Sequence, residues 1–332
     1  MTWWLLLLAA LVVLILFIVK TLHFNHKDCL LGQRLDGKVV IVTGCNQGIG
    51  YEVVGELARR GARVIMACRD LDKAEIARSR LLKRFESARA NRELSTELTG
   101  VHKSQLECEQ LDLQSVSSIR NFALRMIAKE RSVDILVNNA AVNLGHAVFD
   151  SDGIELHLKI NHLGHFLLTE LICPLLEASE HGARVINVSS FNHRLAELNT
   201  KDLCRPTVGS PYSNSKLANV IHAKEISKRW RDSNIVAVSV HPGLTKTEIF
   251  RHMPWTRWVV HTLLSGLAKS PWQGSQTIVY CCLADDLAPG AYYVECRASQ
   301  VNSQAFNEKV GDYLWTASEQ LIQKWEIHER SQ

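Results

Sequence analysis

The hydrophobic residues of this chain fall into two alternating kinds of segment. Short runs rich in β-branched residues, such as KVVIVTG and ARVINVSS, are typical of strands buried on both faces of a parallel sheet. We predict strands at residues 38–44, 62–68, 104–113, 133–139, 183–190, 235–243 and 291–295. We predict helices, from apolar residues at helical spacing, at residues 50–60, 71–95, 115–130, 153–179 and 212–230. This alternation predicts an α/β fold with one doubly wound parallel sheet and helices on both faces.

The first residues break this alternation. Residues 3–19 form an unbroken apolar run, WWLLLLAALVVLILFIV, which as a helix with a rise of about 1.5 Å per residue would reach roughly 26 Å. That length is just enough to cross the hydrocarbon core of a bilayer. A cleaved signal peptide is the alternative, but it would have a basic start, a shorter apolar core and a small-residue cleavage site. We therefore predict a transmembrane anchor at residues 1–19, a linker at 20–36 and a single folded domain at 37–332.

Charge and cysteine content suggest where this domain lies. The basic residues near the anchor follow it, at Lys20, Lys27, Arg34 and Lys38, and this side of a membrane helix usually faces the cytosol. The nine cysteines include no C-x-x-C pair, and an odd number cannot all pair internally, which favours reduced thiols on the cytosolic side. A composition that is 46% apolar, with a net charge of +4 and no dense basic run, predicts a packed core and no nucleic-acid partner.

The first predicted strand runs directly into a glycine-rich turn, TGCNQGIG, which opens the first helix. Gly44, Gly48 and Gly50 suit a backbone that turns tightly and approaches a pyrophosphate on the amides of a helix N-terminus. The second strand is followed by Arg69, where an NAD enzyme usually has a carboxylate that binds the ribose 2′-hydroxyl. A guanidinium there favours a 2′-phosphate and therefore NADP(H), while the neighbouring acid Asp70 is the argument for NAD.

Tyr212 and Lys216 stand one helical turn apart in the stretch YSNSK. Such a pair can be an ordinary surface contact, or the ammonium group can make the phenol acidic enough for proton transfer. Ser189 and Ser190 end a predicted parallel strand, at the edge of the sheet where ligands bind, although serine also commonly follows a strand.

Asn161 lies in the middle of a predicted helix, where an amide is unfavourable. It indicates either an exposed polar position or a polar kink that serves a chain of water molecules. His162 and His165 stand nearby at i,i+3 spacing, but no acid or cysteine stands beside them, so we predict no metal site.

Taken together, these motifs resemble the short-chain dehydrogenase/reductase family. TGCNQGIG, LDL, NNAA, INHLGHFLLT, NVSS, YSNSK and VHPGLTKT occur in the family's order, between about Lys38 and Leu321. The phrases ACRD, NHLGHFLLT and SKLANV resemble its retinol-dehydrogenase-like branch, whose members are often membrane-anchored. The resemblance implies a Rossmann-type catalytic domain at residues 37–332. One departure is visible, because the family's usual N-N-A-G has Ala141 in place of the glycine, which could crowd the cofactor turn.

The resemblance also implies residue roles. The catalytic set would be Asn161, Ser190, Tyr212 and Lys216, with Ser190 also binding the substrate oxygen. The cofactor would be NADP(H), held by Gly44, Gly48, Ile49, Gly50, Arg69, Asp112, Asn138, Tyr212, Lys216 and Thr245. In this scheme Arg69 binds the ribose phosphate, Asp112 lies at the adenine, Asn138 contacts the adenosine end, and Thr245 approaches the nicotinamide carboxamide. Asn161 would hold the water that relays protons to solvent.

The chemistry implied is hydride transfer between nicotinamide and a carbonyl carbon, with Tyr212 as the acid/base. Tyrosine has a pKa near 10, and we expect the Lys216 ammonium and the nicotinamide charge to lower it toward the working pH. Residues 248–272 are rich in Trp, Met and aliphatic residues, which suits a lid over a lipophilic alcohol or aldehyde, or a second membrane contact.

We therefore expect a membrane-anchored oxidoreductase of a retinoid, sterol or polyprenoid type of substrate. It would lie in the endoplasmic reticulum membrane with its catalytic domain facing the cytosol, and a homodimer is one possible assembly. The first alternative is a non-catalytic NADP(H)-binding scaffold or redox sensor on the same fold, which Ala141 slightly favours. The second is a reductase of soluble carbonyl compounds whose anchor sets only its location.

Overall fold

The computed structural model describes residues 27–90, 98–247 and 268–331, together with residues 3, 249 and 258. Strands in these ranges form one sheet in the order β3-β2-β1-β4-β5-β6-β7-β8. Their bounds are β1 Val39–Thr43, β2 Arg63–Cys68, β3 Leu106–Gln110, β4 Ile135–Asn138, β5 Ala183–Val188, β6 Ile235–His241, β7 Tyr292–Val294 and β8 Arg297–Ser299. All neighbours are parallel except the β7–β8 pair. The strand order reverses between β1 and β4, and open α/β sheets bind ligands at such a point.

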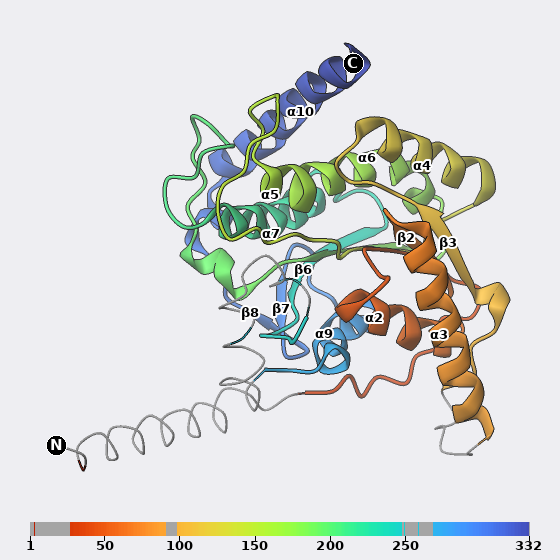
Figure 1. Ribbon diagram of the computed structural model, residues 1–332. Helices are drawn as coiled ribbons and strands as arrows, with labels where there is room; N and C mark the ends of the chain where they lie inside the picture. The colour runs from red at the N-terminus through yellow and green to blue at the C-terminus, as the bar shows by residue number, and fades with distance from the viewer. Residues whose placement is uncertain are drawn as a thin grey trace.

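Helices cover both faces of this sheet (Figure 1). The helices are α2 Gly48–Arg59, α3 Leu71–Ala90, α4 Val116–Lys129, α5 Leu156–Leu158, α6 Gly164–Glu177, α7 Pro211–Arg229, α9 Pro271–Leu283 and α10 Glu308–Ser331. Short turns are η1 Lys103–Gln105, η2 Lys159–Leu163, η3 Phe191–Leu195 and η5 Ser303–Phe306. Helices α2, α3 and α9 pack on one face, and α4, α6 and α7 pack on the other, with α10 lying outside α4 and α7. The sheet is therefore the middle of three layers.

Each face of the sheet has its own hydrophobic core because successive strand residues point to opposite sides. Val40 and Val64, paired between β1 and β2, belong to the core under α2 and α9. Ile41 and Ile65, the next pair along, belong to the core under α4 and α6. All four side chains are fully buried. This is why the strands are nearly continuous apolar runs in the sequence.

The predicted α/β fold and the order of its predicted elements are confirmed, and the structure differs from the prediction at three places. The helix predicted at 153–179 is divided by the turn η2, a π-helical turn in which the N–H of Gly164 bonds the carbonyl of Lys159, five residues earlier. Strand β8 was not predicted because its hairpin turns through Glu295 and Cys296, two non-glycine residues with φ of 50° and 56°. Helices α9 and α10 were also not predicted, although α9 begins with a capping box of Ser270 and Gln273.

Two predicted features lie largely outside the described residues. The anchor at residues 1–19 is one, with residue 3 as its sole described position, and the apolar stretch at 248–272 is the other. Where the structure describes the chain, no helix combines the length and the apolar character needed to cross a bilayer. The anchor and the lid remain predictions.

Candidate active site

A cavity of about 360 Å³ opens at the carboxyl ends of the parallel strands. Its lining includes the turn after β1, Arg69 after β2, Asp112 after β3, Asn139 to Asn143 after β4, and Ser189 after β5. Tyr212 and Lys216 of α7 lie at the other end of the same lining. The parallel sheet thus brings the predicted cofactor turn and the predicted catalytic pair into one cleft.

The glycine-rich turn has the geometry that its sequence predicts. Gly44 and Gly48 have φ of +62° and +65°, a region that side chains disfavour. A Cβ on Gly44 would lie 2.7 Å from the Ala140 Cβ, and one on Gly50 would lie 2.5 Å from the Asn139 amide nitrogen. The helix α2 that follows has no side-chain cap at Gln47, so the N–H groups of its first turn are open to an anion. These residues fit a dinucleotide pyrophosphate.

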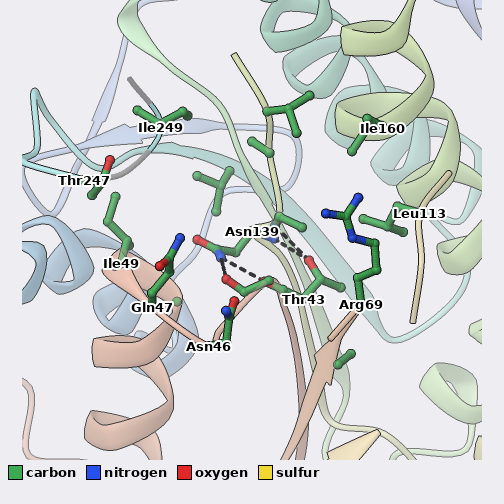
Figure 2. Close-up of a pocket in the computed structure, with 18 of the residues that line it drawn as sticks. Thr43, Asn46, Gln47, Ile49, Arg69, Leu113, Asn139, Ile160, Thr247 and Ile249 are labelled. Atoms are coloured by element: carbon green, nitrogen blue, oxygen red, sulfur yellow. Dashed lines mark hydrogen bonds between the residues drawn. The ribbon is translucent and has the colours of Figure 1, made fainter. Parts of the chain in front are cut away.

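Arg69 extends from the end of β2 into the cavity beside Leu113 (Figure 2), and it is exposed. The neighbouring acid, Asp70, contacts Lys73. The Asp70 carboxylate accepts the backbone N–H of Lys73 at 3.1 Å and pairs with the Lys73 ammonium at 2.6 Å, at the start of α3. Lys73 also lines the cavity, so two cations border this end.

The structure corrects the predicted position of Asn138. Its side chain is buried inside the sheet, where the amide nitrogen donates to Asn187 at 2.9 Å and to Thr169 at 3.1 Å. The next residue, Asn139, lines the cavity and donates its amide to the carbonyls of Thr43 and Gly44 at 2.8 and 3.2 Å (Figure 2). Strand β4 ends at Asn138, so the ligand-facing loop begins one residue later.

A similar shift applies to Thr245. It is buried, its hydroxyl donates to the Gly243 carbonyl at 3.1 Å, and it packs against Gly274. Thr247, two residues on, lines the cavity next to Gly48 (Figure 2). Both lie in the stretch LTKT, where two threonines at strand-like spacing offer no local signal to distinguish them.

Lys216 is almost completely buried, with 1% of its surface exposed. Its ammonium donates to the Val188 carbonyl at 2.9 Å and lies over the Tyr212 ring, 5.7 Å from the ring centroid. Ser190 acts on the Tyr212 hydroxyl, because its side chain lowers the pKa of that group. Ser189 instead donates to the Lys216 carbonyl at 2.7 Å and holds the helix backbone. Of the two serines, Ser190 is therefore the one whose side chain influences the Tyr212 hydroxyl.

The pKa values at this end differ from the sequence-based expectation. Burial raises the pKa of Tyr212 to about 12, and only the hydrogen bond from Ser190 opposes this shift. Burial also lowers the pKa of Lys216 to about 7, which makes the amine a weaker source of positive charge. The predicted lowering of the Tyr212 pKa by Lys216 is not present in this structure, because desolvation outweighs a cation that sits over the ring face.

The Asn161 side chain is fully buried in the π-helical turn and does not line the cavity. Its amide oxygen accepts the Val142 N–H at 2.8 Å, and its nitrogen donates to the Val142 carbonyl and to the Ser215 hydroxyl, each at 3.0 Å. It thereby joins the wall after β4 to the helix that carries Tyr212. Its predicted water-binding role stays a prediction.

Ala141 also lines the cavity, and its backbone φ is not positive. The methyl group at the place of the family's usual glycine therefore causes no backbone strain. Asp112 also lines the cavity, and its role at the adenine stays a prediction. In the part of the chain that the structure describes, no cluster of His, Cys, Asp and Glu could hold a metal ion.

Comparison with known proteins assigns the chain to a family. The family described as short chain dehydrogenase matches residues 38–257. Bovine retinol dehydrogenase 12 is 39% identical over 304 residues, covering 90% of each chain. Human retinol dehydrogenase 11 is 37% identical over 299 residues, covering 89% of this chain and 88% of the relative.

Solved structures agree on the fold. An uncharacterised protein from Mycobacterium paratuberculosis is 30% identical and superposes with a TM-score of 0.65. The match covers 87% of this chain and 94% of that protein. A short chain dehydrogenase from Shigella flexneri in complex with NADP, 20% identical, has a TM-score of 0.60, with 80% of this chain and 100% of that chain covered.

The chain belongs to the short-chain dehydrogenase family, and its resemblance to the retinol-dehydrogenase-like branch is confirmed. It is an oxidoreductase that acts on alcohols and uses a nicotinamide cofactor.

Proposed function

We propose that the protein is a membrane-anchored, NADP(H)-dependent oxidoreductase that interconverts a lipophilic alcohol and its aldehyde or ketone, with Tyr212 as the acid/base. The observation that carries this proposal is the single cavity that joins the glycine turn and Arg69 to Tyr212 and Lys216. A dinucleotide of extended shape fits this arrangement, with its phosphates at α2 and its reactive ring near α7.

The preference for NADP(H) over NAD(H) rests on the residues after β2. Arg69 and Lys73 both line that end of the cavity, and the nearby acid, Asp70, is already engaged by Lys73. Asp70 lines the same end, but its ion pair with Lys73 weakens the argument for binding an unmodified ribose 2′-hydroxyl. A 2′-phosphate would find the Arg69 guanidinium and its charge-assisted hydrogen bonds there, with Lys73 nearby.

The catalytic end suits proton transfer to an oxygen atom. The nicotinamide supplies or accepts the hydride when it is bound. The Tyr212 hydroxyl, with its raised pKa, is protonated at neutral pH and can donate to a carbonyl oxygen during reduction. Ser190, whose side chain lowers the pKa of that hydroxyl, would orient the same oxygen. The Lys216 amine holds the end of β5 through Val188 and so fixes α7 against the sheet.

A lipophilic substrate is supported by the surface beside this end. Phe191 and Leu195, on the turn directly after Ser190, are 50% and 64% exposed. Val208, just before α7, is 51% exposed and its segment pairs with residue Glu197. The names of the related retinol dehydrogenases agree with a substrate of this chemistry. Ala141, the residue that favoured a non-catalytic scaffold, has no positive backbone φ, and its effect on the cofactor turn stays a prediction.

The test of this function is turnover of all-trans-retinal and of a short water-soluble aldehyde by purified full-length protein. We expect the kcat/KM for retinal reduction to be at least about tenfold higher with NADPH than with NADH. One charge-assisted contact to the 2′-phosphate is enough to produce a difference of this size. We expect the soluble aldehyde to be a poor substrate. Binding of NADPH without turnover of retinal or of sterol and polyprenoid carbonyls would favour the scaffold instead.

The location is tested separately. We propose that residues 1–19 span the endoplasmic reticulum membrane and that the folded domain faces the cytosol, in agreement with nine free cysteines. Protease should then digest the domain in intact microsomes, and the protein should resist alkaline carbonate extraction. A chain lacking residues 1–20 should be soluble and still bind NADPH. Protection from protease until detergent is added would reverse the orientation.

A further inference from the structure

The wall of the cavity formed by residues 139–142 is held by hydrogen bonds at both ends. At one end, the Thr43 hydroxyl oxygen accepts the backbone N–H groups of Asn139 and Ala140, each at 2.9 Å. At the other end, the Asn161 side chain bonds both the N–H and the carbonyl of Val142, at 2.8 and 3.0 Å. The end of β1, at the start of the cofactor turn, and the π-helical turn around Asn161 therefore both hydrogen-bond the same short segment.

His165 connects Thr43 and Asn161, the two residues that hydrogen-bond this segment. Its Nε2 lies 2.9 Å from the Thr43 hydroxyl oxygen, and its Nδ1 lies 3.1 Å from the Asn161 carbonyl oxygen. The imidazole is 1% exposed and does not line the cavity. It closes a hydrogen-bonded ring that runs from Thr43 through the wall to Asn161 and back through His165.

The donors and acceptors in this ring have only one consistent arrangement. A carbonyl oxygen can only accept, so Nδ1 of His165 must carry the proton that it donates to Asn161. Burial lowers the pKa of His165 to about 3, so the ring is neutral and its Nε2 is an acceptor. Thr43 must then donate its single hydroxyl proton to Nε2, since its other acceptor, the Val137 carbonyl, is at the longer distance of 3.4 Å.

The ring meets the active site at two places. Ala140, Ala141 and Val142 face the cavity where the cofactor would lie. Asn161 also donates to Ser215, whose own hydroxyl donates to the Tyr212 carbonyl at 2.8 Å. A substitution of His165 would therefore alter the position of the cavity wall and of the helix turn that carries Tyr212.

We propose that His165 is a positioning residue that couples the cofactor turn to Asn161, so that cofactor binding and alignment of the Tyr212 helix depend on one hydrogen-bonded ring. The inference deepens the proposed function and rests on it for its kinetic part, while cofactor affinity tests it independently of any substrate. In the sequence, His165 stands out only by its i,i+3 spacing from His162, for which no metal site is predicted.

The experiment compares His165→Leu with His165→Gln in the full-length protein. Leucine removes both hydrogen bonds, and we expect NADPH affinity to fall about tenfold, because two buried groups lose their partner. Glutamine offers an amide donor and acceptor in one planar group, so we expect affinity within about threefold of wild type. For retinal reduction we expect kcat to fall in His165→Leu and to recover in His165→Gln.

His162→Leu is the matched control. His162 is equally buried three residues earlier, but it bonds Ser318 of α10 at 3.0 Å and takes no part in the ring. We expect its loss to lower the melting temperature while leaving NADPH affinity within about threefold of wild type. Wild-type NADPH affinity in His165→Leu, or an equal loss in His162→Leu, would overturn the proposal.

A second variant covers the case in which His165→Leu does not fold. The shorter amide of His165→Asn can reach Asn161 but not Thr43, so one link of the ring remains, and we expect NADPH binding to weaken at least about threefold. Unchanged affinity would contradict the coupling. If no lipophilic carbonyl is turned over by wild type but the affinities follow this pattern, the proposed function fails and the ring stands.

Discussion

The cavity is bordered at one end by Asp70 and Lys73 and at the other by Tyr212 and Lys216. Both pairs stand near the start of a helix, at i,i+3 and i,i+4 spacing, and both place a lysine beside an acidic group. The side chains of Lys73 and Asp70 are 67% and 40% exposed and form a direct ion pair at 2.6 Å. Lys216 is 1% exposed and bonds a backbone carbonyl instead.

Burial makes these similar spacings chemically different. Contact with Lys73 lowers the pKa of Asp70, as expected for a solvated ion pair. Desolvation raises the pKa of Tyr212 to about 12 and lowers that of Lys216 to about 7. Spacing along a helix thus indicates that two groups can meet, but the surrounding layers decide which of them keeps its charge.

The largest expected effect is at the buried end. Tyr212→Phe keeps the ring and removes the hydroxyl, so it should lower kcat about 10²–10⁴-fold while leaving the Kd for NADPH nearly unchanged. Retinal reduction and NADPH fluorescence titration measure the two quantities. A variant with kcat within threefold of wild type would exclude Tyr212 as the acid/base.

At the exposed end, Arg69→Ala should weaken NADPH binding about 10–150-fold, which is the range for loss of a charge-assisted contact. NADH lacks the 2′-phosphate and should be affected much less. Parallel titrations with both cofactors test this, and an equal loss for both would assign Arg69 a structural role and return attention to Asp70.

The variant Lys216→Met tests whether burial shifts the pKa of Lys216, through the pH dependence of the unfolding free energy. The pKa of Lys216 is about 7 in the fold and about 10.5 in the unfolded chain, so unfolding takes up a proton and stability from this group rises with pH between those values. Relative to the variant, wild type should therefore gain up to about 1.4 kcal/mol of unfolding free energy per pH unit. Urea unfolding of both proteins at pH 7.5 and 8.5 isolates this difference, because other titrating groups contribute to both. A constant difference would mean that Lys216 stays charged.

The smallest expected effect is that of Asp70→Asn. The amide oxygen can still accept the Lys73 N–H, and the lost ion pair is exposed, so stability should change little. Removal of a negative charge near Arg69 should raise NADPH affinity by no more than about threefold, and less at high salt. A large loss of NADH affinity in this variant would show that Asp70 binds the ribose after all.

The site was predictable where its residues follow directly from a strand–turn–helix pattern. Gly44, Gly48 and Gly50 could be placed because the turn they form is local, and Arg69 because it follows the end of a strand. Asn138 and Thr245 were each misplaced by one or two residues. Which of two adjacent asparagines or alternate threonines faces a ligand depends on where the strand stops and on what packs against it, here Asn187 and Gly274.

The sequence by itself determined the order of the elements, the buried parallel sheet and the glycine turn, because hydrophobic periodicity and backbone freedom act over a few residues. The tertiary structure alone decided the direction of the Tyr212 pKa shift, the role of Asn161 and the place of His165. Thr43 ends β1 and His165 lies in the first turn of α6, so only the packing of α6 on the sheet brings the Thr43 hydroxyl within 2.9 Å of the imidazole, whereas the 3.1 Å contact of His165 with the Asn161 carbonyl is local, at i,i+4 spacing. Desolvation and hydrogen bonding depend on such long-range contacts, which the spacing of residues along the chain does not contain.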